Sequence, residues 1–248
     1  MKKFKRLTWF IAAALVLPLS FSVVACSNGD DDDSDSGSSP SQSLSQRINS
    51  GTGDVDLGGA AFSEDVTISR ACTVSNASFG GKTITVTKSG VTLKNIANAS
   101  VIADAAIGAG ELTIEGCTLA SLTVRGGGAN SIYVKGGTVT SLAVEKDGVH
   151  MVLDNGAKVE STTVSAQRAL IENKATMKTL TVQANVEQLT LAASGEAAKI
   201  QSLILQAKAN EAGGKKTATI TLTAPVAIDS VETQDESGSK ATDATVTI

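Results

Sequence analysis

The segment that decides the fold is ELTIEGCTLASLTVRGGGANSIYVKGGTVTSLAV, residues 111–144. One apolar pattern occurs in it twice: a pair of apolar residues two apart, a step of five, a single apolar residue, and a second pair. The residues that fill it are Leu112, Ile114, Leu119, Leu122 and Val124, and then Ile132, Val134, Val139, Leu142 and Val144. Because apolar residues that alternate with polar ones are typical of β-strands, each copy predicts two short strands.

The same pattern continues on both sides of this segment with a period near 20 residues. Three later copies are Met151, Leu153, Val159, Thr162 and Val164; Ala169, Ile171, Met177, Leu180 and Val182; and Leu189, Leu191, Ile200, Leu203 and Leu205. Less regular copies lie near Val66, Ile84 and Val91 upstream and near Ile220 and Val226 downstream. In this alignment Met151 and Leu153 correspond to Ala169 and Ile171.

A single short strand cannot bury its apolar side chains, so equivalent positions must stack from turn to turn. The prediction is an all-β chain, a parallel β-solenoid of about 7–8 turns, with strands about 4.8 Å apart. A leucine-rich repeat is the alternative, since Leu119-x-x-Leu122-x-Val124 fits its core. That repeat also requires an asparagine three residues later, and Gly127 and Asp147 stand there in two of the turns.

At the N-terminal side of the repeats, Ser43-Leu44-Ser45-Gln46 has the spacing of a capping box, and a short helix is expected within residues 47–57. From Ser43 to Ile228 the chain resembles right-handed parallel β-helix proteins of the pectin-lyase-like class. The resemblance implies an architecture, and many functions share one fold.

Catalytic motifs of that class are not matched by the repeats. Its polysaccharide hydrolases carry a Gly-His-Gly and an Arg-x-Lys, and the one histidine here, His150, stands in Asp-Gly-Val-His. His150 is expected to be an ordinary solvent-facing residue, and Asp154, Glu160 and Glu172 to be isolated acids. The sequence therefore predicts no enzyme, no cofactor and no metal site.

The N-terminal residues indicate export and lipid anchoring. Four basic residues precede an apolar stretch, Leu7 to Leu19, that closes on Val23-Val24-Ala25-Cys26. This resembles the signal peptide and lipobox of bacterial lipoproteins, which implies acylation of Cys26. Ser27, rather than Asp, resembles lipoproteins sorted to the outer membrane, on its periplasmic or cell-surface side. A transmembrane helix over residues 7–24 is the alternative, although it is close to the lower length limit.

The expected organisation is therefore a signal peptide at 1–25, an acidic and serine-rich tether at 26–42, a β-helix domain at 43–233, and a tail or capping strand at 234–248. Without residues 1–25, 17 basic residues face 25 acidic ones, a net charge of −8. This charge argues against nucleic acid as a partner. Loss of the signal also leaves Phe62, Phe79 and Tyr133 as the aromatic residues. Because sugar-binding sites commonly use aromatic side chains as platforms, this composition argues against sugar binding of that kind.

Two further features of the repeats remain, one on the outside and one inside. Tyr133, Val152 and Leu170 are expected on successive turns of the first strand, where they would form an apolar stripe that could contact a protein partner. Cys72 and Cys117 are expected to be buried and unpaired, at a similar phase about two turns apart. Together these observations predict a non-catalytic, lipid-anchored envelope protein, adhesin-like or a structural binding scaffold. The alternative is a carbohydrate-binding or carbohydrate-active β-helix protein.

Overall fold

The structure is a computed structural model that describes residues 42–129, 131–195, 198–209, 214–224, 226–241 and 244–247. The expected signal peptide, Cys26 and almost all of the expected tether lie outside these residues. Within the described ranges, no helix combines the length and hydrophobicity needed to cross a bilayer.

The N-terminal helix α1 (Leu44–Ser50) covers the first turn of the coil. Its capping box is confirmed: the Ser43 hydroxyl accepts from the Gln46 amide, and the Gln46 side chain accepts from the Ser43 amide. Leu44 and Ile48 are buried against the first strands. The helix is shorter than expected, because Gly51 ends it and residues from Val55 onward form a strand.

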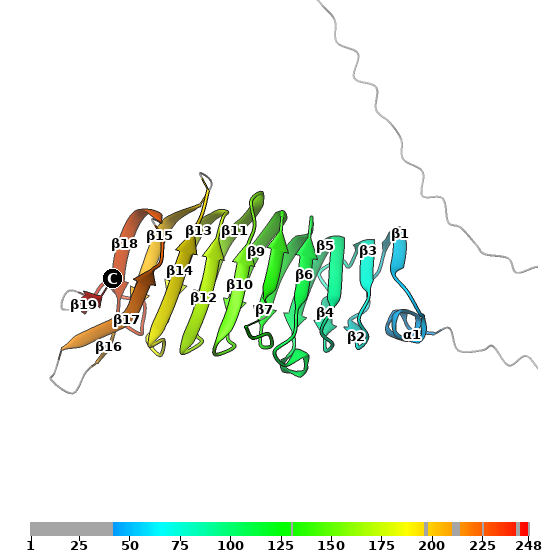
Figure 1. Ribbon diagram of the computed structural model, residues 1–248, viewed down its shortest axis with the longest axis horizontal. Helices are drawn as coiled ribbons and strands as arrows, with labels where there is room; N and C mark the ends of the chain where they lie inside the picture. Colours follow the sequence, from blue (N-terminus) through cyan, green and yellow to red (C-terminus); the bar gives the residue numbers. More distant parts are fainter. Residues whose placement is uncertain are drawn as a thin grey trace, which may run out of the picture. The chain divides into compact units, whose positions relative to one another are not determined.

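The strands form two main faces of a coil, and each turn contributes one strand to each face (Figure 1). The first face contains β1 (Val55–Ala61), β3 (Thr73–Ser78), the start of β5 (Val91–Ala103), β6 (Leu112–Glu115), β8 (Ile132–Lys135), β10 (Val149–Leu153), β12 (Arg168–Asn173), β14 (Gln188–Ala193), β17 (Lys215–Leu222) and β19 (Ala244–Thr247). The second face contains β2 (Val66–Ile68), β4 (Thr83–Val86), the end of β5 (Val91–Ala103), β7 (Thr118–Val124), β9 (Gly137–Val144), β11 (Ala157–Val164), β13 (Thr176–Val182), β15 (Lys199–Gln206) and β18 (Ala227–Gln234).

Two elements remain. They are β16 (Lys208–Ala209), which pairs with β17, and the short 3-10 helix η1 (Ala105–Ile107), which lies between β5 and β6 in the chain. Neighbouring strands pair in parallel, with β16 and β17 as an antiparallel exception.

Apolar side chains stack in columns along the inside of the coil. One column on the second face runs through Val66, Ile84, Val101, Leu122, Leu142, Thr162, Leu180, Leu203 and Val231. Each column removes apolar surface from water in the space between the faces. This burial of apolar surface is the main favourable contribution to the free energy of folding. The predicted parallel β-solenoid is confirmed, with about seven turns. The leucine-rich repeat is wrong, since each turn carries strands on two faces.

The first face differs from the sequence alignment at one turn. Met151 pairs with Ile171 rather than with Ala169, and Val149 takes the place opposite Ala169. The cause is the corner after β12: Asn173, which pairs with Leu153, lies four residues before Met177, whereas Leu153 lies six residues before the equivalent Val159. From β12 to β14 the pairing follows the alignment again, with Ala169 opposite Leu189 and Ile171 opposite Leu191.

Both described cysteines are buried and free, as expected. The expectation that the two cysteines occupy similar positions in the repeat is wrong. The Cys72 carbonyl accepts from the Thr92 amide just before β3, whereas Cys117 lies at the corner between β6 and β7. There the Cys117 thiol donates to the Leu93 carbonyl at 3.3 Å.

Candidate functional site

The three residues expected to form an apolar stripe do not lie in one row. Val152 pairs with Tyr133 on one side and with Glu172 on the other, while Leu170 pairs with His150 and Thr190. The two-residue shift on the first face separates Leu170 from the others. Val152 is also only 4% exposed, so it offers little surface to a partner.

One face of the Tyr133 ring is in contact with a side chain of the same strand, β8. The Lys135 ammonium lies 5.2 Å from the centre of the Tyr133 ring, a distance at which a cation and an aromatic face attract each other. The Lys135 side chain therefore already covers one face of the ring.

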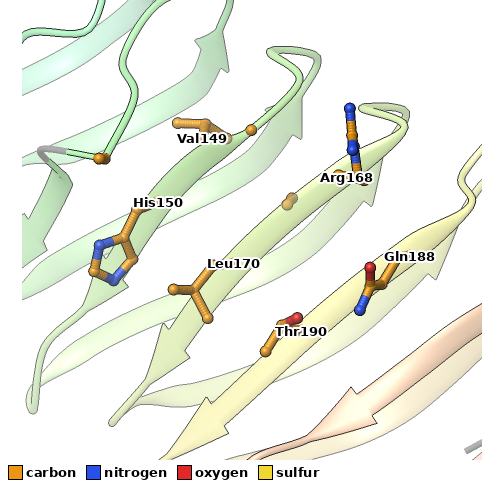
Figure 2. Close-up of a pocket in the computed structure, with 9 residues that line it drawn as sticks. Val149, His150, Arg168, Leu170, Gln188 and Thr190 are labelled. Atoms are coloured by element: carbon orange, nitrogen blue, oxygen red, sulfur yellow. The ribbon is translucent and has the colours of Figure 1, made fainter.

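Leu170 lies in a groove on the outward side of β10, β12 and β14 (Figure 2). The groove has a volume of about 350 Å³. His150, Leu170 and Thr190 follow one another across the three strands and form its floor. Arg168 and Gln188 pair with each other at the start of their strands and form one rim.

The space in the groove arises at a glycine turn. Gly148 has a φ of +72°, and a Cβ placed there would meet no atom within 4 Å. The Gly148 amide donates to the Arg168 carbonyl at 2.8 Å, and the Arg168 amide donates to Asp147 Oδ1 at 2.7 Å. The Arg168 guanidinium is held more loosely, with Nη2 3.6 Å from Asp147 Oδ2 and a side chain that is 65% exposed. It can therefore turn toward a ligand.

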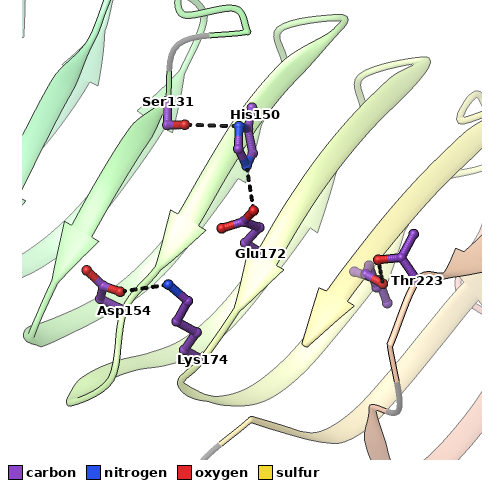
Figure 3. Close-up of polar contacts among 7 residues, drawn as sticks. Ser131, His150, Asp154, Glu172, Lys174 and Thr223 are labelled. Carbon is purple, nitrogen blue, oxygen red and sulfur yellow. Dashed lines mark hydrogen bonds and ion pairs between the residues drawn. The ribbon is translucent and has the colours of Figure 1, made fainter. Parts of the chain in front are cut away.

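His150 lies on the outward side of β10, as expected, and two neighbours hold it in place there. Its Nδ1 lies 3.0 Å from the Ser131 hydroxyl, and its Nε2 lies 3.5 Å from Glu172 Oε1 (Figure 3). The side chain is 22% exposed. Because Ser131 is itself buried, its hydroxyl is not presented to a substrate; the contact orients the imidazole at the edge of the groove.

The acids expected to be isolated are paired with bases on the next turn. Lys174 Nζ lies 3.4 Å from Asp154 Oδ1, and Lys178 Nζ lies 3.3 Å from Glu160 Oε2. Residues about 20 apart in the sequence become direct neighbours in a parallel coil, which brings each acid within reach of a base. These pairs are solvent-exposed, and such pairs typically contribute less than about 1 kcal/mol.

Across the described part of the chain, no group of three or more histidine, cysteine or acidic side chains is arranged to hold a metal ion. The chemistry that the groove offers is recognition: a leucine on its floor, a guanidinium and an amide on its rim, and a hydroxyl and an imidazole at its sides. An apolar anchor ringed by polar groups and arginine is typical of the centre of a protein interface.

Comparison of the chain with protein-family models, with curated proteins and with solved structures finds no match.

Sequence reasoning found Leu170 but missed the neighbours that shape its surroundings. The signal that could have found His150 and Glu172 is their spacing of 22, one turn plus two residues, which places them diagonally across neighbouring strands. The spacing of 20 between Arg168 and Gln188, which is one turn, likewise indicates that they are neighbours on adjacent strands.

Proposed function

We propose that this protein is a non-catalytic, lipid-anchored protein of the bacterial cell envelope that binds a protein partner on the first face of its solenoid. In this role it acts as an adhesin-like or structural scaffold. The observation that carries the proposal is the groove between β10 and β14, where Leu170 lies on the floor and Arg168 and Gln188 lie on the rim.

The rigidity of the coil supports a scaffold role. Each strand of the first face from β6 to β14 pairs with a strand on both sides, so the groove residues stand on a backbone that neighbouring strands hold in place. A site built on paired strands loses little conformational freedom when a partner binds.

A protein partner is favoured over a sugar because of the aromatic residues. Glycan binding commonly depends on exposed aromatic platforms. Phe62 and Phe79 pack against each other with ring centres 5.7 Å apart, and Tyr133 is covered on one face by Lys135. None of the three lines the groove.

The membrane anchor rests on the sequence around Cys26, which supports acylation and outer-membrane sorting. Labelling of cells with a clickable palmitate analogue is expected to mark the protein, and Cys26→Ser is expected to abolish the label. Proteinase treatment of intact cells then distinguishes the cell surface from the periplasmic side. Retention of the label in the Cys26→Ser protein would contradict the anchor.

The partner site is tested by placing a photo-crosslinking amino acid at Leu170 of the full chain in intact cells. Ser161, which faces outward on β11 of the second face, is the matched control position. We expect a discrete adduct from position 170, at least fivefold weaker from position 161 and weakened by Arg168→Glu. The adduct should shift on protease treatment of the partner. Equal adducts from both positions, or an adduct removed by glycosidases, would contradict the proposal.

A further inference from the structure

We propose that the cavity between the Gln167 turn and the β16–β17 hairpin binds a small phosphate-bearing polyol, such as a sugar phosphate. This site is separate from the groove, and the inference does not depend on the function proposed above. The cavity has a volume of about 560 Å³. Its polar lining consists of Gln167, Asn185, Glu187, Lys208, Lys216 and Thr217.

The observation that points to an anion is a pair of lysines placed directly opposite each other. Lys208 pairs with Lys216 in the antiparallel ladder between β16 and β17. Side chains in such a pair have Cβ atoms about 4.5–5.5 Å apart, and like charges there destabilise the ladder. Among the described side chains, neither ammonium group has a carboxylate within ion-pair distance. An anion between them would relieve the repulsion.

The charge of the whole chain makes this arrangement stand out. The sequence carries 21 basic and 25 acidic residues, so the chain has no overall excess of positive charge. Two exposed lysines that face one cavity concentrate anions there. A phosphate monoester, with a charge of about −1.5 to −2 at neutral pH, matches two ammonium groups better than a single carboxylate does.

The other side of the cavity favours hydroxyl groups. The Glu187 carboxylate would repel a second anionic group and can accept hydrogen bonds from hydroxyls, and the Gln167 amide can both donate and accept. The expected ligand is therefore asymmetric, with phosphate at the lysines and hydroxyls at Glu187. The cavity volume lies within the range of about 300–1,000 Å³ that is usual for small-molecule sites.

Thermal unfolding of the full chain in detergent tests the site, with glucose 6-phosphate as the probe. Glucose and sodium chloride at matched ionic strength are the comparisons. We expect a saturable rise in melting temperature with glucose 6-phosphate alone. Dioctanoyl phosphatidylglycerol, a soluble lipid, forms a second arm. Protection by this lipid without protection by glucose 6-phosphate would assign the site to a lipid headgroup and overturn the sugar phosphate.

The variant pair is Lys208→Gln with Lys216→Gln, and the charge-matched control is Lys82→Gln with Lys158→Gln. In low salt without ligand, the first variant is expected to melt at a higher temperature than the wild type, because the repulsion is gone. Its apparent Kd for glucose 6-phosphate should rise at least tenfold, while the control binds as the wild type does. Equal protection of the Lys208/Lys216 variant, or no protection of the wild type, would overturn the inference.

Discussion

Thr162 pairs with Leu142 inside the coil, and its fully buried hydroxyl has no hydrogen-bond partner among the described residues. The column that holds both residues is otherwise apolar from Val66 to Leu203. A buried polar group without a partner costs free energy, since it gives up its hydrogen bond to water.

Replacement of this hydroxyl by a methyl group should therefore stabilise the protein. We expect Thr162→Val to raise the free energy of unfolding by about 1 kcal/mol, measured by chemical denaturation. Thr163→Val, which changes the outward-facing neighbour on the same strand, is the control and should change the free energy by less than about 0.5 kcal/mol. A destabilised Thr162→Val protein would show that the hydroxyl has a partner, such as a buried water.

Gly137 is expected to be far less tolerant of substitution than its neighbour. Both Gly136 and Gly137 have positive φ angles, +73° and +78°. A Cβ on Gly136 would meet no atom within 4 Å, whereas one on Gly137 would overlap the Cys117 carbonyl oxygen and lie 2.7 Å from the Cys117 amide nitrogen.

Gly136→Ala should therefore cost only the backbone strain, about 1–2 kcal/mol. Gly137→Ala should cost about 3–4 kcal/mol, because two turns of the coil must move apart. Equal losses in the two unfolding curves would contradict the close approach at this corner.

The Cys117 thiol should make the protein less stable at high pH. Burial raises the pKa of Cys117 from 9.0 to about 11. The folded state keeps its proton between these values while the unfolded state loses it. Stability therefore falls as the pH rises, by about 1.4 kcal/mol per pH unit attributable to this group.

Two measurements check this effect. The difference in unfolding free energy between the wild type and Cys117→Ala should shrink as the pH increases from 9 toward 11. Iodoacetamide should also modify Cys117 slowly at pH 8 in the folded protein and rapidly in urea. Fast modification of the folded protein would contradict the burial of this thiol.

The pair formed by Lys94 and Glu115 should be visible in a carboxyl titration. Lys94 Nζ lies 2.7 Å from Glu115 Oε1, and this hydrogen bond holds the pKa of Glu115 below its ordinary value of 4.5. The stabilisation that it provides is present at neutral pH and is lost as the pH falls through the lowered pKa.

We expect ¹³C NMR to show that Lys94→Met raises the pKa of Glu115 toward its ordinary value. Lys174→Met, which removes the partner of Asp154, should leave Glu115 unchanged. A Glu115 titration that is the same in the wild type and in Lys94→Met would exclude the contact in solution.

The second face was predictable from the sequence as far as β13, because the step between its inward residues varies little there. From β7 to β13, the step between equivalent inward residues stays near 20, so Leu122, Leu142, Thr162 and Leu180 could be aligned by counting. The first face was misaligned at one turn, although its own step also stays near 20. Counting from the second face placed Met151 opposite Ala169 rather than Ile171, because the connection back to the second face is two residues shorter after Asn173 than after its partner Leu153.

The sequence by itself determined that the chain is a parallel coil, where the coil is capped, and which side chains fill it. The reason is that the spacing of apolar residues can be read along the chain, and residues at that spacing stack in columns when they are buried. The proposal of a lipid anchor at Cys26 also comes from the sequence alone. The tertiary structure alone decided which outward residues meet. His150 against Glu172, Leu170 beside Arg168, and Lys208 opposite Lys216 depend on the stagger between strands, which corner geometry sets and which no local pattern records.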